Sequence, residues 1–173
     1  MMKKTAILLC STLLFSLGAG QTASASKGTT VIEDDTITWE VKTGTSKLPD
    51  TDITDLVGIG TKSPYSQVQL YSTLRPSKVW NVKKKKYKFK GITSSPTLYT
   101  NYKLTGKNTY SIYVKNLSKN KIKFKAKRML KTYVTQSVPA KQVAKITFTG
   151  IKSDTEFYLT FDGRDIEFKG HIK

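Results

Sequence analysis

Lysine is the residue type in this chain whose spacing suggests a chemical role, and that role is the binding of anions. Lys121, Lys123, Lys125 and Lys127 alternate with apolar residues, so a β-strand would place all four ammonium groups on one face. Neighbouring members of this series would lie about 6–7 Å apart. Such a row can follow the repeated phosphates of teichoic acids, anionic lipid surfaces or nucleic acids. Because this binding releases counterions, it weakens steeply as salt rises.

A second group of lysines extends the predicted binding surface. Counting back from Tyr87 and Phe89 would place Lys83 and Lys85 in the core, where unpaired ammonium groups are too costly to bury. The four lysines at 83–86 are therefore predicted to form a turn, a bulge or an overhanging strand end in water. The predicted polyanion-binding residues are Lys83, Lys84, Lys85, Lys86, Lys88, Lys90, Lys119, Lys121, Lys123, Lys125, Lys127, Arg128 and Lys131.

The distribution of charge along the chain favours one strongly positive surface. Residues 61–152 contain 22 lysines and arginines and no Asp or Glu. By contrast, residues 26–60 carry seven acids against three lysines, and residues 153–173 carry five acids against three basic residues. Only three of the 30 basic residues are Arg, the residue suited to bidentate recognition of phosphates and bases. The composition thus predicts diffuse attraction of polyanions rather than a sculpted pocket.

The residues available for catalysis favour a non-enzymatic protein without a cofactor. His171 is the only histidine, so a Ser-His-Asp arrangement would have to use a residue next to the end of the sequence. The only cysteine, Cys10, lies in the predicted leader. A pair of carboxylates that hydrolyses a glycan remains an open alternative.

Metal binding has one weak candidate, a calcium site formed by Asp50, Asp52 and Asp55. Calcium prefers clustered oxygen ligands, but Asp55 occupies the position at which an EF-hand loop needs Gly. Solvated loop acids are the favoured interpretation, and no metal site is predicted. Asn116-Leu117-Ser118 is a glycosylation sequon on a predicted turn.

Residues 1–25 are predicted to be a signal peptide. A positive start at Lys3 and Lys4 precedes an apolar run at 5–20, and Ala23-Ser24-Ala25 forms a cleavage signal. Removal of these two lysines changes the net charge from +18 to +16. The protein is therefore expected to be secreted, and to be extracellular or associated with the cell wall. A lysine-rich β-domain behind a short leader is typical of small secreted proteins of Gram-positive bacteria.

Residues 26–173 are predicted to form one all-β domain, a two-sheet sandwich with an immunoglobulin-like or jelly-roll-like topology and about nine or ten strands. Residues 26–78 form an acidic, loop-rich part with a long loop at 43–64, and residues 79–173 contain regular strands. Asp162-Gly163 between two alternating runs predicts a hairpin. The strands predicted by pattern lie at 36–42, 67–73, 87–90, 97–104, 110–115, 121–127, 131–137, 142–149, 156–161 and 165–172.

These features predict a secreted protein that binds anionic polymers or surfaces of the bacterial envelope or matrix through a lysine-rich sheet face. Its expected partner is an anionic cell-wall polymer or an anionic lipid surface, with no dedicated nucleic-acid target. One alternative is a cationic membrane-active antimicrobial or toxin protein. A second alternative is an inhibitor or recognition module that uses the loop at 43–64. The acidic segment 26–60 also permits self-association through the basic face of a neighbouring copy.

Overall fold

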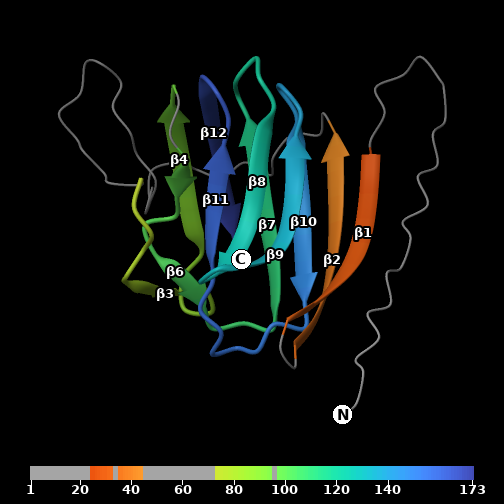
Figure 1. Ribbon diagram of the computed structural model, residues 1–173, viewed down its shortest axis with the longest axis vertical. Coiled ribbons are helices and arrows are strands. Elements are labelled where there is room, and N and C mark those ends of the chain that lie inside the picture. The colour runs from red at the N-terminus through yellow and green to blue at the C-terminus, as the bar shows by residue number, and fades with distance from the viewer. Residues whose placement is uncertain (1–23, 33–34, 45–72, 95–96) are drawn as a thin grey trace, which may run out of the picture.

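The computed structural model describes residues 24–32, 35–44, 73–94 and 97–173, and all regular structure in these ranges is β-strand. A six-stranded sheet has the order β1-β2-β10-β7-β12-β4, and a four-stranded sheet has the order β5-β11-β8-β9. In Figure 1 the four-stranded sheet lies over the middle of the six-stranded sheet, and β9 contacts β1, β2 and β7.

The strands of the six-stranded sheet are β1 (Ser24–Ile32), β2 (Asp35–Gly44), β4 (Tyr87–Thr93), β7 (Thr109–Asn116), β10 (Val143–Thr149) and β12 (Ile166–Ile172). Those of the four-stranded sheet are β5 (Leu98–Tyr99), β8 (Ile122–Arg128), β9 (Lys131–Val138) and β11 (Tyr158–Asp162). The short strands β3 (Val79–Asn81) and β6 (Lys103–Thr105) form a separate parallel pair.

The predicted all-β sandwich is confirmed, although its twelve strands exceed the nine or ten expected. One additional strand is β1, whose Ser, Gly and Thr content gives little strand signal. Another arises because the single strand predicted at 97–104 is two short strands, β5 and β6, which belong to different sheets.

The hairpin predicted at Asp162-Gly163 is wrong. β11 ends at Asp162 and pairs with β5 and β8, whereas β12 pairs with β4 and β7. The connection therefore crosses from one sheet to the other. Turn residues show where the chain reverses, but not whether the next strand stays in the same sheet.

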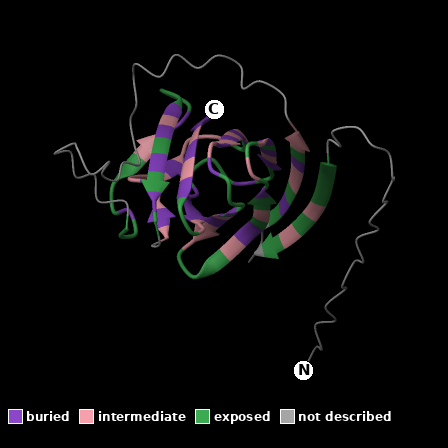
Figure 2. Cartoon of the chain, turned by 90° about the horizontal axis from the view of Figure 1, so that it is seen from above, coloured by how far each residue is buried: buried purple, intermediate pink, exposed green. Residues whose placement is uncertain are grey.

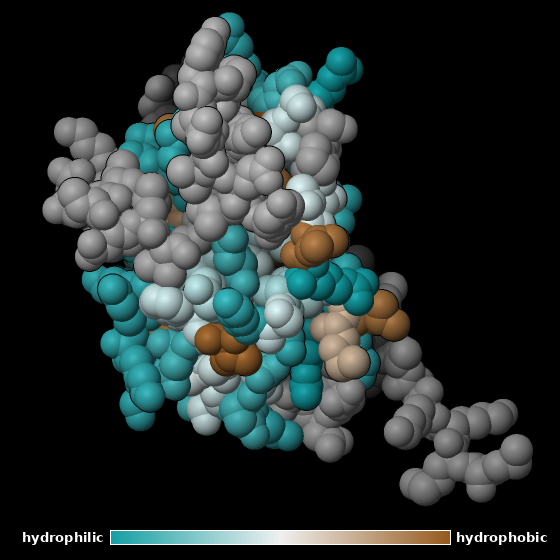
Figure 3. All heavy atoms as spheres, turned by 90° about the vertical axis from the view of Figure 1, so that its left-hand side faces the viewer, coloured by the Kyte–Doolittle hydropathy of each residue, from teal (hydrophilic) through white to brown (hydrophobic). Residues whose placement is uncertain are grey.

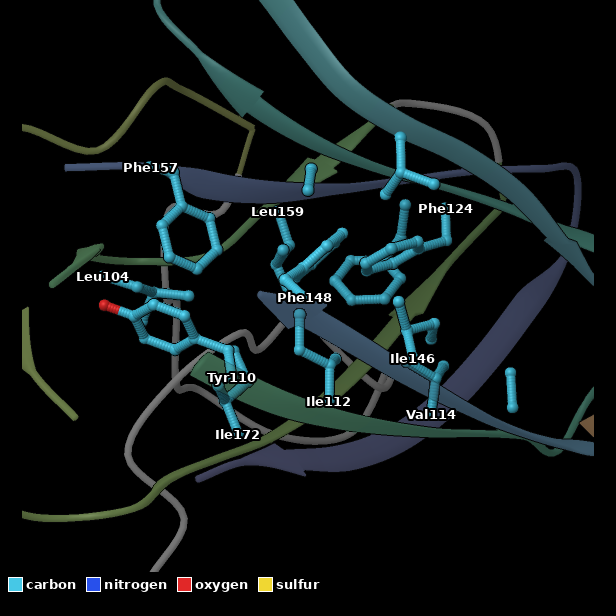
Figure 4. Close-up of a cluster of buried hydrophobic side chains, with 14 of the residues drawn as sticks. Leu104, Tyr110, Ile112, Val114, Phe124, Ile146, Phe148, Phe157, Leu159 and Ile172 are labelled. Carbon is cyan, nitrogen blue, oxygen red and sulfur yellow. The ribbon is translucent and has the colours of Figure 1, made fainter. Parts of the chain in front are cut away.

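Alternating apolar residues from both sheets meet in one core (Figure 4). The Phe161 ring packs against three other rings of this core, with centroids 5.4 Å from Phe89, 5.6 Å from Phe124 and 4.2 Å from Phe168. Phe89 and Phe168 come from the six-stranded sheet and Phe124 from the four-stranded sheet, so these rings join the two layers. Burial of each such side chain contributes about 1.5–3 kcal/mol. Seen from above, the central strands carry most buried positions, whereas the β1–β2 hairpin is largely exposed or intermediate (Figure 2).

The predicted sequon is buried. Asn116 is fully buried, and its Nδ2 donates hydrogen bonds to the carbonyls of Asn120, Val138 and Pro139 at 2.8–3.0 Å. Its Oδ1 accepts a hydrogen bond from the backbone N–H of Ser118 at 2.9 Å. Asn116 is therefore a structural residue that ties together the β7–β8 and β9–β10 connections at one end of the sandwich.

Several predictions concern residues outside the described ranges. These are residues 1–23 of the signal peptide, most of the strand at 67–73 and of the loop at 43–64, and the calcium candidates Asp50, Asp52 and Asp55. They stay predictions. In the described part of the chain there is no helix long and apolar enough to span a bilayer.

Candidate polyanion-binding site

Lys83, Lys84, Lys85 and Lys86 form an exposed turn between β3 and β4, hereafter the lysine turn. This arrangement confirms the prediction that all four ammonium groups reach water. Asn81 Oδ1 accepts hydrogen bonds from the N–H groups of Lys83 at 3.0 Å and Lys84 at 3.3 Å. Trp80 Nε1 donates to the Lys85 carbonyl at 2.8 Å. The turn is thus fixed by its neighbours in sequence, and its side chains are the groups left for a ligand.

An open cavity of about 770 Å³ lies beside the lysine turn. Its lining residues are Val82, Lys83, Lys84, Lys85, Lys86, Gly106, Lys107, Asn108, Thr109, Ser111 and Lys173. Six of them are lysines and none is an acid. Gly106 has φ +102°, and a Cβ there would lie 2.2 Å from Asn81 Oδ1. Glycine therefore permits the β6–β7 turn to approach the lysine turn and complete the cavity.

The cavity continues onto the outer surface of the six-stranded sheet, where six lysines form what we call the basic face. These residues are Lys88, Lys90, Lys115, Lys145, Lys169 and Lys173. Lys169 lies directly opposite Lys90 on one side and Lys115 on the other. Like charges in opposite cross-strand positions are destabilising. An acid at one of these positions would relieve that repulsion, and Lys90 has such a partner in Glu167, whose Oε1 lies 3.2 Å from Lys90 Nζ.

An aromatic pair lies at the centre of the basic face. The rings of Tyr113 and His171 stack with centroids 4.6 Å apart and planes 22° apart. Lys145 Nζ and Lys173 Nζ lie 5.7 Å and 5.5 Å from the Tyr113 centroid, within the range of cation–π attraction. His171 is only 3% exposed, and burial lowers its pKa to about 4, with Lys173, Lys86 and Lys88 adding to the shift.

His171 is therefore neutral near pH 7, and its ring stacks on Tyr113. Its Nδ1 has no hydrogen-bond partner among the described residues. In the same ranges, no three His, Cys, Asp or Glu side chains cluster in a way that could hold a metal ion.

The row formed by Lys121, Lys123, Lys125 and Lys127, hereafter the lysine stripe, lies on the outer surface of the four-stranded sheet. Lys125 Nζ is 2.8 Å from Asp162 Oδ2, and Thr97 donates to Asp162 Oδ1 at 2.5 Å. Burial raises the pKa of Asp162, but these contacts and the charge of Lys123 outweigh burial and hold the pKa below its usual value. Asp162 lies outside residues 61–152, the block that contains no acid, and it neutralises part of the positive charge of the lysine stripe.

The expectation of one positive surface is wrong. Phe89 and Phe124 both point toward Phe161 in the core, so the alternating lysines beside them point in opposite directions, away from both sheets. Lys119 is exposed in the β7–β8 connection, and Arg128 and Lys131 flank the β8–β9 turn. Of the predicted residues, only the lysine turn, Lys88 and Lys90 belong to the site around the cavity.

Sequence reasoning missed five lysines of this site: Lys107, Lys115, Lys145, Lys169 and Lys173. The alternation in β10 and β12 indicates outward-facing lysines, but the order of strands in the sheet is needed to bring them together. On the side of the molecule that carries β3, β4 and β6, the described residues in view are mostly hydrophilic, with a few separate hydrophobic groups (Figure 3). This distribution is consistent with a solvated basic surface.

One acid of the N-terminal segment 26–60, Glu40, forms ion pairs within its own hairpin. Glu40 on β2 lies 3.2 Å from Lys42 Nζ and 3.8 Å from Lys27 Nζ. The hydrogen bond from Lys42 is the main cause that lowers the pKa of Glu40. Self-association through this segment stays a prediction, and Glu40 contributes little to it because its partners lie in its own hairpin.

No family model, curated protein sequence or solved structure matches the chain. A function must therefore be argued from the surface itself.

Proposed function

We propose that the protein is secreted and non-enzymatic, and that it binds an anionic polymer of the bacterial envelope or matrix through the lysine turn and the basic face. The observation that carries this proposal is the cavity lined by six lysines and no acid. Its volume lies within the roughly 300–1,000 Å³ of ligand sites, although its lining is far more cationic than usual. One charged group of a polymer would occupy the cavity, and neighbouring groups would contact the basic face. Each Lys–anion contact is weak, so affinity comes from many contacts acting together.

The lysine turn and the basic face are favoured over the lysine stripe because no acid lines the cavity between them. Its six lysines repel one another, and on the basic face Lys169 lies between Lys90 and Lys115, although Glu167 offsets part of the charge of Lys90. A bound polyanion would remove this repulsion, so binding gains free energy that an isolated lysine does not offer. In the stripe, Asp162 already neutralises Lys125. A phosphate polymer such as teichoic acid supplies closely spaced charges and is the first ligand to test.

The experiment is sedimentation of the protein with purified Gram-positive cell walls, before and after removal of teichoic acid, across a series of salt concentrations. We expect binding that is lost with the phosphate polymer and that falls steeply as salt rises. Absence of binding even at low salt would refute the proposed function.

Two double variants test which surface binds. Lys84→Glu/Lys86→Glu changes the lysine turn, and Lys121→Glu/Lys123→Glu makes the same change of four charges on the stripe. Each reversal removes a contact of about 0.2–1 kcal/mol and adds a comparable repulsion, so the first variant should bind roughly tenfold more weakly. The second should bind within about threefold of the wild type. Equal losses would show that binding depends only on net charge.

A further inference from the structure

The β8–β9 hairpin ends in two exposed apolar side chains. Arg128 pairs with Lys131, which leaves Met129 and Leu130 as a two-residue turn. The exposed fractions of Met129 and Leu130 are 75% and 81%, the largest among the exposed large hydrophobic residues of the described chain. Neighbouring apolar side chains that are this exposed commonly mark an interaction site.

The backbone of this turn does not explain the choice of residues. Met129 has φ +50°, a left-handed conformation in which Gly, Asn and Asp are favoured and a long apolar side chain is not. The Tyr158 hydroxyl donates a hydrogen bond to the Met129 carbonyl at 2.9 Å, so the tip is tied to the neighbouring strand. The hairpin therefore presents an anchored apolar tip at a position where turn chemistry favours small polar residues.

Basic residues surround the tip. Arg128 and Lys131 flank it directly, Lys127 precedes them, and Arg75 lies within electrostatic reach of the Tyr158 phenol. Two acids, Asp154 and Glu156, lie in the connection before β11, and Glu156 is ion-paired with Lys103 at 2.9 Å. Positive charge therefore predominates around the apolar pair.

The lysine turn lies at the same end of the sandwich as the tip. Phe157, directly before β11, contacts Tyr110 near the start of β7, with ring centroids 4.8 Å apart. β11 begins opposite Lys127 near the end of β8. On the other sheet, the start of β4 pairs with the end of β12 near the start of β7. Both sheets thus direct basic turns toward the end drawn at the bottom of Figure 1.

We propose that this end docks on an anionic lipid bilayer, with Met129 and Leu130 inserted among the lipids and the basic residues beside the headgroup phosphates. A bilayer supplies both hydrocarbon for the apolar tip and phosphate for the cations. A soluble polymer would satisfy the lysines but leave the tip in water. The inference goes beyond the polymer binding proposed above: it shares the lysine turn with that site, but it depends on the apolar tip, which the polymer site does not include. Only the tip enters the bilayer, so docking releases no vesicle contents.

The test is co-sedimentation with phosphatidylglycerol vesicles and with phosphatidylcholine vesicles. The wild type should bind the first strongly and the second weakly. Met129→Ser/Leu130→Ser preserves net charge and should reduce partitioning about tenfold or more. Ile92→Ser is the matched control, because Ile92 is an exposed apolar residue of β4 that pairs with Glu167 toward the other end of the sheet. This control should bind like the wild type.

Leu130→Trp reports insertion directly. Its fluorescence should shift to shorter wavelength on vesicles and be quenched by brominated lipid. Unchanged emission on bound vesicles would overturn insertion, and equal binding to both lipids would overturn the role of charge. If the serine variant binds vesicles normally but loses self-association in sedimentation velocity, the tip contacts a second copy and the lipid proposal is wrong. The serine variant should still bind wall polymer, so failure of lipid docking is distinguishable from failure of polymer binding.

Discussion

His171 should make the protein less stable as pH falls below about 6.5. Its ordinary pKa is 6.5, and burial together with Lys173, Lys86 and Lys88 lowers the pKa to about 4 in the folded protein. Above both values the imidazole is neutral in either state. Between them the unfolded chain binds a proton that the folded protein does not, so the free energy of unfolding falls. The 2.5 units between 6.5 and 4 correspond to a loss of about 3 kcal/mol, which levels off below about pH 4.

The sequence makes this measurement simple because His171 is the only histidine. Urea unfolding followed by tryptophan fluorescence should give a free energy about 2 kcal/mol lower at about pH 5 than at about pH 7. His171→Phe keeps an aromatic ring against Tyr113 and removes the titrating group, so its unfolding free energy should be nearly constant over this range. Carboxyl groups titrate mainly below this pH range, so they contribute little to the difference. A wild type without pH dependence, or a phenylalanine variant with the same slope, would refute this account of His171.

Three further predictions concern buried polar contacts and close packing. Asn116→Ala should lower the free energy of unfolding by about 3–4 kcal/mol in urea, because three carbonyls lose their donor; a loss below about 1 kcal/mol would contradict this. Gly170→Ala should prevent a stable fold, because the new Cβ would lie 2.0 Å from the Tyr113 carbonyl oxygen; a wild-type melting temperature would show that the strands can separate. Lys125→Met should raise the pKa of Asp162, because burial is then opposed only by the Thr97 hydrogen bond and the charge of Lys123. Carbon-13 NMR titration of the carboxyl measures this pKa, and an unchanged value would deny the importance of the ion pair.

The strand pattern could be predicted where alternation is strict. The run at 121–127 places Phe124 in the core and its lysines outside, and the structure agrees. The pairing of strands could not be predicted, because alternation identifies the two faces of a strand but not its neighbours. This is why Asp162-Gly163 was expected to close a hairpin and instead joins the two sheets.

The lysine turn was predictable because the cost of burying ammonium groups excludes a regular strand at 83–86. The basic face was not, because it depends on cross-strand positions. Lys115, Lys145 and Lys169 come from three strands that are far apart in sequence, and each follows an ordinary alternating pattern. Only the order of β10, β7 and β12 makes them neighbours.

Residues 61–152 form a block without any acid, and the fold explains which lysines of this block gain an acidic partner and which are left for a ligand. Flanking acids fold back onto the block, where Asp162 pairs with Lys125 and Glu167 pairs with Lys90. In each of these pairs, the acid offsets part of the positive charge of the lysine. Around the cavity no described acid reaches the six lysines, so their mutual repulsion persists in the folded protein. A bound polyanion can relieve that repulsion, so it should raise the free energy of unfolding as well as occupy the surface.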